Sequence, residues 1–201
     1  AIGALGEGSS NNLSKDTDLA LAVGTKLADF TTGSWANFEN PNFKLISVNT
    51  ARYDTTKHLA TPVISDAKVG LLQISEALGD WRAPDTWYQR AIKERDEWEA
   101  YVAKQSGPTN QEEPSYAHAV GAIYRNSDPS DIVVTAAGGL VGEVVQVWKP
   151  KELNTFETEW GFSCMGYEIS GALGIKMAKP DQDVVVFVGD GSYLLNNSDI
   201  Y

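Results

Sequence analysis

The segment Asp183-Val184-Val185-Val186-Phe187-Val188, followed directly by Gly189-Asp190-Gly191-Ser192, decides the fold class of this sequence. Its run of valines predicts a β-strand, and the residues after it predict a tight turn into a helix. Glycines let a backbone approach a ligand closely, and amide groups at a turn and helix start favour an anion such as diphosphate. An Asp at the same place can bind Mg²⁺ through its carboxylate. The plainer alternative is a strand-to-helix turn in which Asp190 caps the helix.

Outside this segment, predicted strands and helices alternate along the chain, which is typical of a parallel α/β sheet. The run Leu19–Val23 has no polar alternation, so we expect a strand that is buried on both faces. Asp66 is expected to cap a helix that ends near Gly79. Further strands are predicted at residues 44–48, 62–65 and 131–135, and further helices at residues 85–104, 115–125 and 165–178.

The predicted fold class is therefore α/β, with two parallel-sheet units in one chain. Residues 105–114 separate the two units, and their Gly, Pro and polar content predicts a linker. This interpretation places one domain at residues 1–104 and a second at residues 115–201.

Composition excludes several classes of protein. The formal net charge is -11, and such an acidic surface repels phosphate backbones, so we expect no nucleic-acid partner. No apolar run approaches about 20 residues, so no membrane span is expected. The single cysteine, Cys164, cannot form a disulfide within the chain, which agrees with a cytoplasmic location.

Four segments follow one another in the second half of the sequence: Gly161–Glu168, Gly171–Gly174, Ala178–Pro180 and Val184–Ser192. They read as a Met-Gly-Tyr helix start, a helix of small residues, an Ala-x-Pro stop, and a valine-rich strand with Gly-Asp-Gly-Ser. In this order and spacing they resemble the cofactor-binding domain of thiamin-diphosphate-dependent enzymes of the acetolactate synthase type. The resemblance implies that residues 115–201 are the first part of a domain that binds thiamin diphosphate and Mg²⁺.

The resemblance also implies a role for each matching residue. Asp190 would be one magnesium ligand, and the backbone near Ser163 would contact the aminopyrimidine of the cofactor. Met165 would be the bulky apolar residue that holds the cofactor in its bent shape, with a core methionine as the alternative. The other residues expected around the metal and diphosphate are Gly138, Gly139 and Leu140, in the loop after the strand at 131–135, and Gly189, Gly191 and Ser192.

The first half resembles the Rossmann-like middle domain of the same enzymes at residues 22–34 and 66–68, so residues 1–104 are expected to be part of that domain. Residues 29–35, 79–84 and 159–168 look most similar to the trihydroxycyclohexanedione hydrolases of myo-inositol breakdown. Enzymes of that kind hydrolyse a carbon–carbon bond of a cyclic 1,2-diketone, which implies a polyol-derived diketone as substrate and a homo-oligomeric full-length protein. Two alternatives stay open. One is an acetolactate-synthase-like carboligase or decarboxylase, and the other is a non-catalytic nucleotide-binding or interaction protein.

Two parts of the family's pattern have no match in the sequence. The family activates its cofactor with a glutamate from an N-terminal domain, and its second metal ligand is an Asn well beyond Gly-Asp-Gly. Asn196 and Asn197 follow Gly191 too closely for that role, and we interpret them as surface or turn residues. We therefore expect the chain to be incomplete, to contain no activating glutamate, and to be inactive alone.

The remaining reactive side chains have plainer interpretations. His58 and His118 fit no metal or triad pattern, so surface or capping roles are expected. Cys164 has no activating motif and is expected to be a buried thiol. Glu143 and Glu168 are expected to be charges on helix surfaces.

Overall fold

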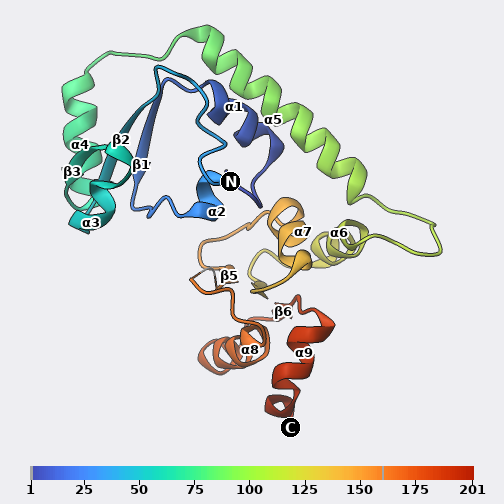
Figure 1. Ribbon diagram of the computed structural model, residues 1–201. Helices are drawn as coiled ribbons and strands as arrows, with labels where there is room; N and C mark the ends of the chain where they lie inside the picture. Colours follow the sequence, from blue (N-terminus) through green and yellow to red (C-terminus); the bar gives the residue numbers. More distant parts are fainter. Residues whose placement is uncertain (1, 160) are drawn as a thin grey trace. The chain divides into compact units, whose positions relative to one another are not determined.

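A computed structural model describes residues 2–159 and 161–201. Ala1, which begins the first predicted domain, and Trp160, which belongs to a stretch that carries the family resemblance, lie outside the described residues. The chain divides into two compact units, Ala1–Glu99 and Ala100–Tyr201, and each contains a three-stranded parallel sheet (Figure 1). The predicted α/β class with two parallel-sheet units is confirmed.

The sheet of the first unit has the strand order β1-β2-β3, with β1 at Leu19–Val23, β2 at Lys44–Asn49 and β3 at Thr61–Ile64. All three predicted strands are found, with ends that shift by one residue at most. Around the sheet lie α1 (Gly8–Asp16), α2 (Asp29–Thr32), α3 (Arg52–Thr55), the 3-10 helix η1 (Lys57–Leu59) and α4 (Ala67–Leu78).

Helix α4 begins where the sequence predicts it. The Asp66 carboxylate accepts hydrogen bonds from the amides of Lys68 at 2.9 Å and Val69 at 3.2 Å, which satisfies two donors of the first turn. Gly70 then packs against β2, because a Cβ at this position would lie only 2.9 Å from a methyl carbon of Val48. The cap and this close approach fix α4 against the sheet.

The expectation that β1 is buried on both faces is wrong. Leu19 is 49% exposed and Leu21 is 43% exposed, whereas Ala22 is buried with Leu27 and Leu45. In the described part of the chain β1 is an edge strand that pairs with β2 alone, so its two faces are covered unequally. An apolar run predicted the strand correctly but not its surroundings.

The long helix α5 (Asp85–Gln105) packs its first part beside α1. The Arg90 guanidinium bonds the Asp16 carboxylate at 2.7 Å, and the Asn12 amide donates to Glu94 at 3.1 Å. Trp98 lies against α1, with its ring 3.0 Å from where a Cβ on Gly8 would stand. The helix predicted at residues 85–104 is thus present, and residues up to Glu99 belong to the first unit.

The sheet of the second unit has the order β5-β4-β6, with β4 at Ile132–Thr135, β5 at Phe156–Thr158 and β6 at Val184–Val186. The strand β5 was not predicted, and β6 is shorter than its valine-rich run. The helices are α6 (Tyr116–Asn126), α7 (Gly139–Val147), α8 (Tyr167–Ala178) and α9 (Asp190–Asn196), followed by the 3-10 helix η2 (Asn197–Ile200).

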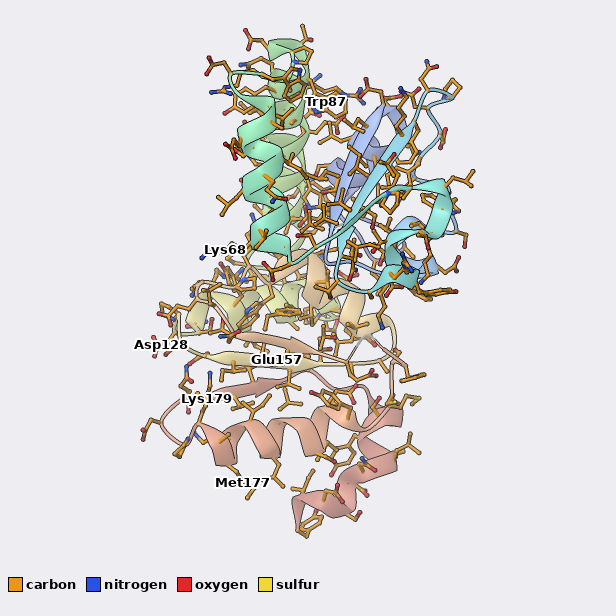
Figure 2. The ribbon with its side chains drawn as sticks, turned by 90° about the vertical axis from the view of Figure 1, so that its left-hand side faces the viewer. Lys68, Trp87, Asp128, Glu157, Met177 and Lys179 are labelled. Carbon is orange, nitrogen blue, oxygen red and sulfur yellow. The ribbon has the colours of Figure 1, made fainter. Side chains whose placement is uncertain are left out.

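The core of the second unit surrounds β4, whose four residues are all buried. Helices α6 and α7 contact each other on one side of the strands, and α8 packs on β4 and β6 from the other side (Figure 2). Trp148, after α7, is buried with its ring 5.9 Å from that of Phe187 and 5.2 Å from that of Tyr124. The central strand therefore lies between two helical layers, which holds its carboxyl end in place.

The two histidines have the surface and capping roles that the sequence predicts. The Ser115 hydroxyl and the His118 ring form a capping box at the start of α6. His58 is exposed, and its Nδ1 accepts a hydrogen bond from the indole Nε1 of Trp35 at 3.0 Å. Across the described residues, no helix is both long enough and apolar enough to cross a membrane.

Candidate cofactor site

The candidate site lies at one edge of the second sheet. Strands β5, β4 and β6 are parallel, so their carboxyl ends meet at the same edge. In open α/β sheets this edge is where ligands bind. Three chain segments follow these strand ends: residues 136–139 after β4, residues 159 and 161–166 after β5, and residues 187–191 after β6.

The segment after β4 ends in two glycines, Gly138 and Gly139, which have no side chains. Gly138 has φ +85° and ψ -173°, a conformation that is essentially limited to glycine, and it precedes α7 without any side-chain cap in the described chain. A Cβ on Gly138 or on Gly139 would have no protein atom within 4 Å. Open space therefore lies beside the two glycines at the start of α7, and the N-terminus of a helix favours an anion.

Leu140 does not lie in a loop as predicted. Gly139 begins α7, so Leu140 is the second residue of a helix, and its side chain is half-buried. The glycine pair suggested a loop, but Gly138 acts as the N-cap and the chain continues as a helix directly after it.

The segment after β6 places Asp190 at the surface. Gly189 is the N-cap of α9 and Asp190 is its first residue, so the predicted turn into a helix is present. The Asp190 side chain is exposed, and its Oδ1 accepts a hydrogen bond from the Gly191 amide at 2.9 Å. Ser192 is buried, at 3% exposure, whereas a Cβ on Gly189 would meet open space. A carboxylate and an open glycine thus stand side by side at this strand end.

The segment after β5 contacts both of the others. Met165 is 51% exposed, and its Cε lies 3.1 Å from where a Cβ on Gly191 would stand. Ser163 has φ +53°, and its hydroxyl donates to the carbonyl of Ala136 at 3.4 Å. The structure therefore brings the predicted residues of all three segments to one edge, and Met165 is a surface residue rather than a core methionine.

Glu168, expected on a helix surface, is fully buried. Its Oε1 accepts from the Ala137 amide at 3.2 Å, and its Oε2 accepts from the Gly166 amide at 2.9 Å. The signal that sequence reasoning missed is its spacing from Ala172, since residues four apart share a helix face and Ala172 is buried too. Glu168 thus joins the segments after β4 and β5.

Cys164 is exposed, so the expected buried thiol is wrong. The amide of Cys164 donates to Glu159 at 2.8 Å, and the Phe162 amide donates to the same carboxylate at 2.9 Å. These two backbone hydrogen bonds lower the pKa of Glu159. Desolvation raises the pKa of the Cys164 thiol, and the nearby Glu159 carboxylate raises it further.

Asn196, interpreted from the sequence as a surface or turn residue, also makes a tertiary contact. It is half-buried at the end of α9, and its amide nitrogen donates to the carbonyl of Gly166 at 3.2 Å. A Cβ on Gly166, where φ is +94°, would lie 2.9 Å from this side chain. Asn196 therefore packs α9 against the start of α8.

The site fits a diphosphate-bearing cofactor in three respects. Glycine backbones at the ends of β4 and β6 face open space, so phosphate oxygens can approach amide groups. The hydroxyls of Thr135 and Thr158, paired in register at the ends of β4 and β5, are buried without a hydrogen-bond partner in the described structure. The Asp190 carboxylate, which is exposed at this edge, suits Mg²⁺ because this ion takes its remaining ligands from phosphate and water.

Comparison with known families agrees with this geometry. Residues 136–201 match the family description "Thiamine pyrophosphate enzyme, C-terminal TPP binding domain". Residues 1–74 match "Thiamine pyrophosphate enzyme, central domain". Thiamine pyrophosphate is another name for thiamin diphosphate. The first sheet lies within one match, and strands β5 and β6 of the second sheet lie within the other, which begins directly after β4.

Individual relatives carry a common name. The chain is 34% identical to 3D-(3,5/4)-trihydroxycyclohexane-1,2-dione hydrolase of Geobacillus thermodenitrificans, over 99% of this chain and 34% of that protein. The corresponding protein of Clostridium tetani is 35% identical over 99% of this chain and 35% of its own length. The protein of Lacticaseibacillus casei is 34% identical over 98% of this chain and 34% of its own length. The chain thus spans about a third of the length of these relatives. It belongs to the thiamine pyrophosphate enzyme family, with a central-domain part followed by a part of the cofactor-binding domain.

Proposed function

We propose that the natural protein is a thiamin-diphosphate- and Mg²⁺-dependent hydrolase that breaks a carbon–carbon bond of trihydroxycyclohexane-1,2-dione in myo-inositol degradation. The observation that carries this proposal is the similarity of 99% of the chain, at 34% and 35% identity, to relatives with this name. The open edge of the second sheet, with the Asp190 carboxylate exposed on it, supports the cofactor assignment.

In this proposal the residues of the chain hold and orient the cofactor. When bound, thiamin diphosphate would supply a nucleophilic carbon and a positively charged thiazolium ring that stabilises a carbanion. Asp190 would be a ligand of the Mg²⁺, and Met165 would support the cofactor. The backbone at Ser163 would contact the aminopyrimidine. The residues that would hold the diphosphate are Gly138, Gly139 and Leu140 after β4, and Gly189, Gly191 and Ser192 after β6.

The 201 residues by themselves are proposed to have no turnover. None of their side chains is assigned as the acid that activates the aminopyrimidine, and only Asp190 is assigned to the metal. Within the described residues, no three His, Cys, Asp or Glu side chains gather where they could bind a metal ion. Catalysis therefore requires groups beyond those identified in this chain.

A homo-oligomer is also part of the proposal. The outer side of α8 and the end of the chain expose apolar side chains, and Met177 points away from the strands (Figure 2). The exposed residues are Leu173, Met177, Leu194, Leu195 and Ile200. A second copy of the protein would cover such a surface. We place the protein in the cytoplasm, in line with its single free cysteine.

The test is an assay of the natural full-length protein beside the 201-residue chain, each with thiamin diphosphate and Mg²⁺. The proposal predicts hydrolysis of the cyclic diketone by the full-length protein only, with loss of activity in Asp190→Ala. Condensation of 2-oxo acids without diketone hydrolysis would instead identify a carboligase. Failure of the full-length protein to bind the cofactor would leave the non-catalytic scaffold as the function.

A further inference from the structure

Glu168 is a buried carboxylate that the proposed function does not use. It is the second residue of α8, and none of its surface is exposed. A carboxylate without hydrogen bonds is strongly disfavoured in a protein interior, so its oxygens need donors. Both donors are backbone amides, and they come from two separate segments of the site.

The two amides belong to turns that contain glycines with positive φ. Ala137 directly precedes Gly138, at φ +85°, and the second amide is that of Gly166, at φ +94°. Glycine has access to many conformations, so its turn needs outside contacts to hold a single one. One oxygen of Glu168 bonds each turn, at 3.2 Å and 2.9 Å, and the rigid carboxylate fixes the distance between them.

These turns lead directly to proposed cofactor contacts. Gly138 and Gly139 follow Ala137 and face the diphosphate in the proposal, and Met165 precedes Gly166. Apart from Glu168, the described structure joins the two segments through the 3.4 Å hydrogen bond from the Ser163 hydroxyl to Ala136. That contact is long for a hydroxyl donor, so Glu168 provides the stronger connection.

The same geometry rules out a direct chemical role for this side chain. A general acid or base has to reach the reacting atoms. Glu168 is fully covered, and each of its oxygens already accepts a hydrogen bond from the backbone. Its contribution is therefore to the positions of other groups.

We propose that Glu168 is a positioning residue whose carboxylate joins the Ala137–Gly139 turn to the Met165–Gly166 turn and so preorganises the site for thiamin diphosphate. This inference rests on the proposed function for the identity of the ligand. The connection between the two turns is a property of the protein without ligand.

The test compares Glu168→Gln, Glu168→Asp and the control Glu152→Gln in the full-length protein. The glutamine side chain of Glu168→Gln would keep one acceptor oxygen and turn an NH₂ group towards the other amide, so one hydrogen bond is lost. The aspartate of Glu168→Asp would keep both oxygens on a shorter side chain. Glu152 is exposed and its side chain forms no part of the site. Residue-resolved hydrogen exchange of Ala137 and Gly166, without cofactor, is the first measurement, and the Kd of thiamin diphosphate with Mg²⁺ is the second.

The inference predicts that Glu168→Gln speeds exchange of at least one of the two amides by about tenfold and weakens cofactor binding by about tenfold, as for one charged hydrogen bond. The exchange rates and the Kd of Glu168→Asp should lie between those of Glu168→Gln and the wild type. Those of Glu152→Gln should match the wild type. Unchanged exchange in Glu168→Gln overturns the inference, and so does faster exchange with unchanged Kd. If Glu168→Gln does not fold, Glu168→Asp decides by the same two criteria. If the wild type binds no cofactor, the proposed function fails, and the exchange rates alone decide whether Glu168 joins the turns.

Discussion

The Cε of Met165 lies 3.1 Å from the position that a Cβ on Gly191 would occupy, so the segment after β5 touches the turn after β6. Met165 is half exposed and flexible, and it can move aside when that space is filled. A substitution at Gly191 therefore tests the position of Met165 more than the stability of the fold.

Gly191→Ala is expected to leave the melting temperature close to that of the wild type and to weaken thiamin diphosphate binding by about tenfold, through displacement of an apolar contact. Gly174→Ala is the matched control, because a Cβ on Gly174 would meet no atom within 4 Å and alanine favours a helix. Titration calorimetry and thermal unfolding give both quantities. Equal cofactor affinity in the two variants would contradict the placement of Met165.

Gly138→Ala is expected to lower the free energy of unfolding by about 1–3 kcal/mol, because alanine is strained at φ +85° and ψ -173°. It should also weaken cofactor binding, since the new methyl group occupies the open space beside α7. Gly24→Ala, at φ +65° and also without atoms near the new Cβ, is the control in the other sheet. Urea denaturation should show a loss for both variants, whereas only Gly138→Ala should change the cofactor Kd.

Gly166 and Asn196 are expected to be energetically coupled. Gly166→Ala adds a methyl group 2.9 Å from the Asn196 side chain at a residue with φ +94°, so a loss of about 1–3 kcal/mol in unfolding free energy is expected. Asn196→Ala removes the two side-chain atoms at 2.9 Å and the hydrogen bond to Gly166, and it leaves only the Cβ at 3.2 Å, so the double variant should lose less than the sum of the single variants. Additive losses in urea denaturation would show that the two residues do not interact.

Glu159 is expected to order the backbone at Phe162 and Cys164 over a defined pH range. Its pKa is lowered in the folded chain by the amides of Cys164 and Phe162, so the deprotonated form binds these amides. The stabilisation is complete above the ordinary glutamate pKa of about 4.3 and is lost as pH falls through the lower folded pKa. Hydrogen exchange of the two amides should therefore stay slow, after correction for intrinsic rates, near neutral pH and rise only in acid. Protection that persists in Glu159→Gln would contradict this role.

The reactivity of the Cys164 thiol provides an independent test of the Glu159 carboxylate. Its pKa is raised by desolvation and by repulsion from Glu159, and the thiolate is the form that reacts with iodoacetamide. Glu159→Gln should lower this pKa and speed alkylation at pH values below it, whereas Glu152→Gln should not. Because Cys164 is the single cysteine, the rate can be measured on the whole protein. An unchanged rate in Glu159→Gln would show that the carboxylate does not act on the thiol.

Local patterns in the sequence predicted most elements of the fold. The strand β1 and the helices α4, α5 and α6 were found within one residue, because apolar runs and caps such as Asp66 act over a few residues. The helices α1 and α7 and the strand β5 were missed. The strand β5 has the sequence Phe-Glu-Thr, and it forms because β4 offers it a partner, which no pattern within the strand reveals.

The sequence indicated which segments form the candidate site, but it did not indicate the hydrogen bonds that join them. The Gly-Asp-Gly-Ser turn pointed to Asp190, and the structure places that carboxylate at the surface. The burial of Glu168 depends on two amides that lie 31 and 2 residues away, so its charge alone suggested a surface position. The exposure of Cys164 and the contact of Asn196 with Gly166 were missed for the same reason, since both are set by tertiary contacts.

The central claim is that thiamin diphosphate binds at the carboxyl ends of β4 and β6, with Mg²⁺ held by Asp190. The most direct measurement is calorimetric titration of the full-length protein with thiamin diphosphate in Mg²⁺, for the wild type and for Asp190→Ala. The account predicts that the wild type binds, and that loss of the metal ligand weakens binding by about 100-fold, as for a charged interaction in a partly enclosed site. Equal affinity in Asp190→Ala, or no binding by the wild type, would contradict it.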